Sequence, residues 1–344
     1  MIRTIIFLVL VALCYSGDIS RAVNQDQIKG LKKLLKGLDA GVYTTCSIVF
    51  FSEKVTYDVA DDRCKNFNIG SGRGEEGNLV TVNDDEKNQD LKILLEMAYP
   101  EKDQPKDKWT DTKWVWAGLR KTKNNKAKKP GPYDPLDWEW ADGSHPTDFK
   151  SWHKNQPDQR ALKPGQKGCN ESPRCFQNQM RINHKGLWDD TYTFKTHPYA
   201  CDYKGKYVLS NDFKTWEQAK EACAAAGLHL AKIRSQAEVE EVKDAMEYFL
   251  TPKDENWSKW DSNNWIWTGG NDLNDEGVWL WLDGSPVESW DIPWIEGAGK
   301  DNAAYLNGAE GQHALAISRW GEFDDSFHKH QKRKRPFACQ CPGS

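Results

Sequence analysis

The same five sequence landmarks occur twice in this chain of 344 residues, and in the same order both times. The clearest pair is the segment 138–144, WEWADGS, which returns at 279–285 as WLWLDGS. The other four pairs are 59–64 with 218–223, 114–119 with 265–270, 188–190 with 323–325, and 199–201 with 337–339. Each copy spans more than about a hundred residues, so the pattern predicts a duplicated domain and not a solenoid of short repeats.

The apolar pattern within each copy predicts two helices, several short strands and one long loop. We expect helices at 59–66 and 84–97 in the first copy, and at 216–226 and 237–249 in the second. The expected strands are 47–51, 78–82, 114–119, the segment around 138–141 and the one around 201, then 207–209, 230–233, 265–270, 279–282 and 336–339. Residues 142–185 are rich in Gly, Pro, Asn and Asp, which is typical of a loop region.

The N-terminal segment is typical of an exported protein. Arg3 precedes an apolar run at 5–14, and small residues follow, so we predict a signal peptide at 1–22 and a secreted, extracellular protein. The run is shorter than the roughly 20 residues that cross a bilayer, and no longer run follows, so no membrane span is expected. Residues 23–42 have the spacing of a short amphipathic helix. We expect it to pack on the first domain, with an oligomerising neck or a membrane-surface helix as alternatives.

Eight of the nine cysteines remain once the predicted signal peptide is removed, and an even number suits an oxidising compartment. In each copy, a cysteine on the first helix and one on the last strand would join the two ends of the domain. Closing loops of this length contributes about 4–5 kcal/mol in the chain-entropy model. The predicted pairs are Cys64–Cys201 and Cys223–Cys339, then a short local loop, Cys169–Cys175, and a clasp of the chain ends, Cys46–Cys341. An intermolecular bond through Cys46 or Cys341 is the alternative to the clasp.

The charge distribution does not favour nucleic acid as a partner, because the formal net charge is −4 and the two signs are interleaved. Two basic runs, 121–129 and 329–335, are typical of solvated loops, with a polyanion as the alternative partner. Asn170 and Asn256 begin possible glycosylation triplets. The sequence contains no zinc-protease, serine-hydrolase or P-loop motif, so we do not expect an enzyme.

The two copies resemble the C-type lectin-like domain. The resemblance rests on the helix cysteine, the tryptophan segment before a glycine, the Trp-x-Trp-x-Asp-Gly-Ser strand, the aromatic-Asp-Asp segment and the final aromatic-Ala-Cys. It implies an α+β fold with two helices, small antiparallel sheets and a long loop region in each copy. The two copies would be tandem domains in one secreted chain, at 43–203 and 206–341. In this family a long loop with a cis proline holds a calcium ion, which also binds two sugar hydroxyls. The chemistry suits Ca²⁺, which takes about 6–8 oxygen ligands.

The resemblance implies a calcium and carbohydrate site in the first copy. Gln156-Pro157-Asp158 matches the motif that the family associates with galactose-type sugars. Asp189 and Asp190 match the second pair of ligands. We therefore predict these four polar residues as ligands of both the calcium ion and the sugar. The alternative is that they are turn-forming residues.

Two departures from the family pattern bear on this site. The family's additional Glu is replaced by Pro173, and Glu171 can substitute for it only if the loop bends differently. In the second copy Lys300 stands where a ligand belongs, and the proline is missing. Asp324 and Asp325 are retained there, and we interpret them as turn or salt-bridge residues. The second copy is therefore expected to lack the sugar site.

The predicted function is that of a secreted, calcium-dependent carbohydrate-binding protein whose partners are glycans or glycoproteins. The alternative is an extracellular matrix or biomineral-associated structural protein that uses the same fold without sugar specificity, with other matrix proteins or polyanions as partners. The intact Gln-Pro-Asp motif favours the first interpretation. The missing Glu and the altered second copy favour the other.

Overall fold

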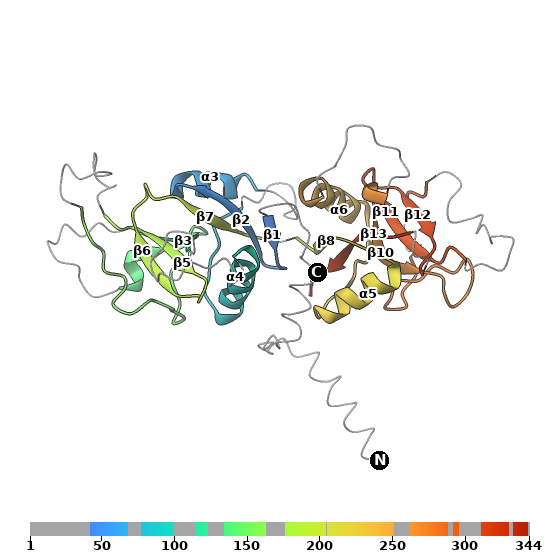
Figure 1. Ribbon diagram of the computed structural model, residues 1–344, viewed down its shortest axis with the longest axis horizontal. Coiled ribbons are helices and arrows are strands. Elements are labelled where there is room, and N and C mark those ends of the chain that lie inside the picture. Colours follow the sequence, from blue (N-terminus) through green and yellow to red (C-terminus); the bar gives the residue numbers. More distant parts are fainter. Residues whose placement is uncertain are drawn as a thin grey trace, which may run out of the picture.

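The computed structural model describes residues 42–67, 77–99, 114–122, 134–162, 176–203, 205–250, 262–287, 292–295, 311–329 and 333–342. They form two sheets that lie side by side, with helices α3 and α4 beside the first and α5 and α6 beside the second (Figure 1). The first half contains β1 (Val42–Thr44), β2 (Ile48–Val55), α3 (Tyr57–Lys65), α4 (Asp85–Ala98), β3 (Trp114–Lys121), β4 (Trp138–Glu139), β5 (Gln179–Asn183), β6 (Trp188–Thr191) and β7 (His197–Asp202). The second contains β8 (Tyr207–Lys214), α5 (Trp216–Ala225), β9 (His229–Leu230), α6 (Gln236–Phe249), β10 (Trp265–Asn271), β11 (Ala314–Ser318), β12 (Phe323–Ser326) and β13 (Arg335–Gln340).

The two sheets have the same strand order. The first runs β2-β7-β3-β5-β6, with β1 added beside β2, and the second runs β8-β13-β10-β11-β12. In each sheet one pair of neighbours is parallel: Trp116 on β3 faces Tyr199 on β7, and Trp267 on β10 faces Phe337 on β13. The other pairs along these two paths are antiparallel. The landmarks that repeat in the sequence therefore occupy matching positions in two sheets of one topology.

The repeated tryptophans make the same bonds in both halves. The indole N–H of Trp116 donates to the carbonyl of Val55 at 2.8 Å, and that of Trp267 donates to the carbonyl of Lys214 at 2.8 Å. Both side chains are fully buried. An unsatisfied N–H away from water costs about 1–3 kcal/mol, so each of these two bonds stabilises its half. Each tryptophan thereby ties its own strand, β3 or β10, to the last residue of β2 or β8.

The Asp-Gly-Ser turns also repeat in detail. Gly143 and Gly284 have φ angles of 84° and 83°, a left-handed conformation that favours glycine. In the first turn the Ser144 hydroxyl donates to the Asp142 carboxylate at 2.7 Å, and in the second the Ser285 hydroxyl donates to Asp283 at 2.6 Å. The similarity therefore extends from topology to side-chain hydrogen bonds.

The disulfides close each half and join the two. Cys64 on α3 is bonded to Cys201 on β7, Cys223 on α5 to Cys339 on β13, and Cys46 to Cys341, with Cα atoms 5.4, 5.6 and 5.6 Å apart. These are three of the pairs expected from the sequence. The fourth, Cys169–Cys175, lies outside the described residues.

The junction between the halves is also packed with aromatic side chains. Tyr203 follows β7, is buried, and donates its hydroxyl to the carbonyl of Tyr207 at 2.8 Å. Its ring lies 6.2 Å from that of Phe249 on α6. Tyr248 on the same helix contacts Phe67 of the first half, with ring centroids 5.1 Å apart. The two halves therefore contact each other through these aromatic side chains.

Several expected elements differ in the structure. The segments 78–82 and 279–282 form isolated bridges instead of strands. The strand expected at 230–233 is shorter and begins one residue earlier, as His229–Leu230. The expected loop region 142–185 contains β5. Asp189, Asp190, Asp324 and Asp325 are strand residues of β6 and β12, so the turn interpretation is wrong for all four.

The predicted signal peptide and nearly all of the predicted helix at 23–42 lie outside the described residues. Within the described part of the chain, no helix has the length and apolarity needed to cross a membrane.

Candidate functional site

The candidate site lies where the loop after Trp152 returns to the edge strand β6. The loop is anchored by paired backbone bonds: the Trp188 N–H donates to the Ser151 carbonyl and the His153 N–H donates to the Trp188 carbonyl, both at 2.8 Å. The indole rings of Trp152 and Trp188 lie 5.6 Å apart in an edge-to-face arrangement. The peptide bond between Gln156 and Pro157 is cis. Packing and backbone pairing therefore hold the Gln-Pro-Asp segment beside the aspartates of β6.

Asp190 holds the turn that carries the motif. Its two carboxylate oxygens accept the backbone N–H groups of Asp158 at 2.9 Å and Gln159 at 2.7 Å. Gln159 has a φ of 48°, the left-handed conformation, which turns its N–H toward the same carboxylate as its neighbour's. Asp190 is fully buried. Burial raises its pKa to about 7, and the nearby Asp158 and Asp189 act in the same direction while the two backbone N–H groups oppose them.

Asp189 is engaged by a cation that the sequence analysis missed. Arg181 on β5 lies directly opposite Asp189 in the ladder and donates from Nε and Nη2 to Oδ2, at 2.9 and 2.8 Å. The guanidinium also stacks over the ring of Trp114, 4.3 Å from its centroid. Burial raises the pKa of Asp189, and Arg181 opposes that shift. The pair was missed because the sequence analysis assigned the residues of β5 to a loop. The β5–β6 hairpin that places Arg181 opposite Asp189 was therefore not predicted.

Asp158 and Gln156 offer the remaining oxygens. The Oε1 atom of Gln156 accepts the Asp158 N–H at 2.8 Å, and Oδ2 of Asp158 pairs with the exposed Arg160 at 2.7 Å. The other oxygen of Asp158, Oδ1, is buried without a hydrogen-bond partner. Such an orphaned carboxylate oxygen is costly unless a cation or a water satisfies it.

The four predicted ligands are thus brought into one neighbourhood, but not into a closed cage. Within the described chain, one group of three acidic or imidazole side chains has its donor atoms within 4.8 Å of one another, and that group is in the second half. Asp158, Asp189 and Asp190 do not approach each other that closely. Glu171 and the sequons at Asn170 and Asn256 lie outside the described residues.

In the second half, a buried cation lies beside the tryptophans of β10. Arg335 lies between Trp265 and Trp267, 5.3 and 5.1 Å from their ring centroids, and donates to the Ser326 hydroxyl at 3.3 Å. Burial lowers its pKa to about 10, and the nearby Asp324 opposes the shift. Asp324 therefore lies near enough to this buried arginine to favour its charged form. Lys300 lies outside the described residues.

The family match concerns the second half of the chain. The family model of the Lectin C-type domain matches residues 212–340. "C-type lectin domain family 4 member M" of Nomascus concolor is 28% identical over 138 residues, which are 39% of this chain and 29% of the relative. The human CD209 antigen is 30% identical over 134 residues, which are 37% of this chain and 28% of the relative. This chain spans less than a third of the length of these relatives.

Solved structures of the same kind are also similar. The mouse scavenger receptor C-type lectin carbohydrate-recognition domain is 25% identical, with a TM-score of 0.31, and the match covers 39% of this chain and 88% of that one. The C-type carbohydrate-recognition domain of cow CD23 is 22% identical, with a TM-score of 0.31, covering 42% and 92%. The sequence match and the strand order together identify one C-type lectin domain in this chain, at residues 212–340.

Proposed function

We propose that this chain is a secreted carbohydrate-binding protein made of two C-type lectin-like units, residues 43–203 and 206–341. The first unit binds Ca²⁺ and a glycan through Gln156, Asp158, Asp189 and Asp190. The assignment of the first unit is supported by the shared strand order and by the matching tryptophan and turn hydrogen bonds. Export is supported by three disulfides, which persist in an oxidising compartment.

The observation that carries the proposal is the bonding of Asp190 to the backbone of Asp158 and Gln159. It fixes the Gln-Pro-Asp turn against β6, although these segments are about thirty residues apart in the sequence. The amide and carboxylate oxygens of the four residues are the ligand type that Ca²⁺ prefers. When bound, the ion would supply a positive charge that coordinates neighbouring sugar hydroxyls.

The unpartnered Oδ1 of Asp158 fits a cation at this place. The Arg181–Asp189 pair fits less well, because a calcium ion using Oδ2 of Asp189 must compete with a guanidinium bonded at 2.8 Å. We therefore place Gln156, Asp158 and Asp190 at the centre of the site, with Asp189 joining when Arg181 gives way. The galactose-type motif makes galactose the first sugar to test.

The matrix-protein alternative is favoured by one observation. Two arginines, Arg160 and Arg181, already neutralise Asp158 and Asp189, so the first unit does not need an ion to balance these charges. The second unit lacks the Gln-Pro-Asp motif, which favours protein contact over sugar binding there. In both interpretations the chain acts by binding and not by catalysis.

Affinity retention tests the proposal. The intact protein is passed over galactose and mannose resins with calcium and then with EDTA, beside a Gln156→Ala, Asp158→Ala variant. The matched control is Asp148→Ala, an exposed carboxylate in the same loop. We expect calcium-dependent retention of the parent and the control, and its loss in the double variant. Equal retention of all three proteins in EDTA would show that retention requires neither calcium nor these two residues, and would contradict the proposed calcium site.

A further inference from the structure

We propose, on the basis of the function proposed above, that the site of the first unit selects anionic galactosides and that Arg160 binds their sulfate or carboxylate group. Nε of Arg160 lies 2.7 Å from Oδ2 of Asp158, one of the predicted calcium ligands. The arginine side chain is 75% exposed, whereas that of Asp158 is 21% exposed. The pair therefore lies at the edge of the site, with a carboxylate on the inner side and a guanidinium in contact with solvent.

The backbone of Arg160 is fixed although its side chain is exposed. Its N–H donates to Oε1 of Gln177 at 2.8 Å, and its carbonyl accepts the N–H of Gln177 at 3.1 Å. The next residue, Ala161, forms a bridge with Phe176. The guanidinium can therefore change its partner by rotation of the side chain, without movement of the loop that carries Gln-Pro-Asp.

A second cation approaches the motif from the end of β3. The ammonium group of Lys121 donates to Oε1 of Gln159, the residue between Asp158 and Arg160. The backbone N–H of Gln159 donates in turn to Asp190 at 2.7 Å. Two positive charges therefore border the carboxylates of the site, and positive charges raise the local concentration of an anionic ligand.

The guanidinium group determines the chemical class of the ligand. Its N–H groups form a rigid fork that matches the oxygens of a carboxylate or of a tetrahedral oxyanion, such as a sulfate ester. A neutral galactoside offers only uncharged hydroxyls, so it cannot replace the Asp158 carboxylate as the partner of Arg160. A galactoside with a sulfate or carboxylate group can replace it, because one anion then takes the place of another.

This exchange of partners links the anionic group of the ligand to calcium binding. Arg160 is paired with Oδ2 of Asp158, while Oδ1 is buried without a hydrogen-bond partner. Once a ligand anion pairs with the guanidinium, both oxygens of Asp158 become available to a calcium ion. Because such coupling is reciprocal, a ligand that strengthens calcium binding is itself bound more tightly when calcium is present. Arg160 thereby favours calcium binding with an anionic glycan over calcium binding with a neutral one.

Calorimetry on the intact, oxidised protein tests this selectivity. Four sugars are titrated in saturating calcium: galactose, galactose 3-sulfate, galactose 6-sulfate and galacturonic acid. The variant is Arg160→Gln, which removes the charge at an exposed position and is therefore expected to fold. The matched control is Lys185→Gln, which changes the net charge equally at an exposed position in the turn between β5 and β6. The parent and both variants are also titrated with calcium alone.

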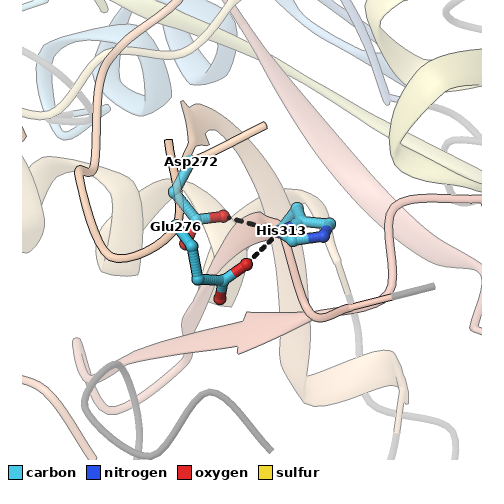
Figure 2. A group of neighbouring side chains, drawn as sticks. All are labelled: Asp272, Glu276 and His313. Carbon is cyan, nitrogen blue, oxygen red and sulfur yellow. Dashed lines mark hydrogen bonds and ion pairs between the residues drawn. The ribbon is translucent and has the colours of Figure 1, made fainter. Parts of the chain in front are cut away.

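Calcium uptake is compared between variants because the second half holds another group of possible ligand atoms. Figure 2 shows the carboxylates of Asp272 and Glu276 directed toward His313, with oxygens 3.0 and 3.5 Å from Nδ1. Any ion bound there is common to the parent and both variants. The difference between Arg160→Gln and the parent therefore reports on the first unit alone.

We expect the parent and Lys185→Gln to bind at least one anionic sugar about fivefold more tightly than galactose, as an exposed ion pair allows. Arg160→Gln should lose this preference, and without sugar it should bind calcium more tightly than the parent does. Equal affinities of the parent for all four sugars, or an unchanged preference in Arg160→Gln, would overturn the selectivity and leave the calcium site in place. Failure of the parent to bind calcium and any of the sugars would overturn the proposed function, and the selectivity with it.

Discussion

Replacing Arg181 by Met is expected to destabilise the first half strongly, because it strands a buried carboxylate. Asp189 is 4% exposed, and its Oδ2 atom accepts both bonds from Arg181. Removing one partner of a buried pair costs about 3–5 kcal/mol, and the lost stacking on Trp114 adds about 0.5–1 kcal/mol. For a unit of this size about 4 kcal/mol lowers the melting temperature by about 8–16 °C.

The assay is thermal unfolding followed by circular dichroism, with Arg120→Met as the control. Arg120 lies on β3, in the same sheet, and pairs with Glu139 at 3.3 Å, with 46% and 30% of the side chains exposed. An exposed pair of this kind is worth at most about 1 kcal/mol. Equal melting temperatures of the two variants would refute the assignment of a buried, stabilising pair.

The pH dependence of the Arg181→Met deficit gives a second check. Burial already raises the pKa of Asp189, and loss of the arginine removes the main factor that opposes this rise. The stranded carboxylate therefore takes up a proton as the pH falls, and a neutral acid is cheaper to bury than a charge. The deficit relative to the parent is expected to be smaller at pH 5 than at pH 8, and a deficit that grows on acidification would contradict the charge argument.

Three further predictions concern other parts of the molecule. Burial raises the pKa of Asp190 to about 7, so a proton competes with calcium for this carboxylate below that pH. Calorimetry should therefore give about fifty-fold weaker calcium binding at pH 5 than at pH 7. Equal affinities at the two pH values would contradict a role of Asp190 as a ligand. The Cys46–Cys341 bond lies within one chain, so the protein should run as a monomer in non-reducing electrophoresis, and a covalent dimer that Cys341→Ser abolishes would favour the intermolecular alternative. Trp267→Phe should lower the free energy of unfolding by about 3 kcal/mol in denaturant titrations, because a buried carbonyl loses its donor. Trp320→Phe, at a position 47% exposed, should lower it by less than about 0.5 kcal/mol. Similar losses in the two variants would argue against the repeated hydrogen bond.

The repeat was the feature from which the sequence predicted most of the fold. Landmarks that recur in order must occupy equivalent places if the two copies fold alike, and Trp116 and Trp267 do so in the central parallel pairs. The ends of the four described helices were predicted to within about two residues, because their apolar spacing is regular.

Strands were predicted less well, because burial alone does not make a ladder. Leu79, Val80 and Val82 are buried as an apolar run suggests, but the run bonds to the sheet through single contacts. The reverse error occurred at β5, where Met180 and Ile182 alternate with polar residues inside a region dominated by turn-forming sequence. Composition averaged over a long window concealed a short strand.

The site could be predicted only where its residues are local in sequence or belong to a recognised motif. Gln156, Asp158 and Asp190 are in one neighbourhood, as the motif implied. The partner of Asp189 depends on hairpin register, and the approach of His313 to Asp272 depends on the pairing of two strands across forty residues. Register is a property of the folded sheet, which spacing along the chain does not specify.

The measurement that tests the central claim most directly is calcium titration calorimetry on the oxidised, full-length protein and on Gln156→Ala, Asp158→Ala, each with and without galactose or mannose. The account predicts saturable calcium binding by the parent, strengthened by one of the two sugars. It also predicts one fewer calcium equivalent in the double variant. Identical isotherms for the two proteins, or no calcium uptake by the parent, would contradict a calcium-dependent sugar site in the first half.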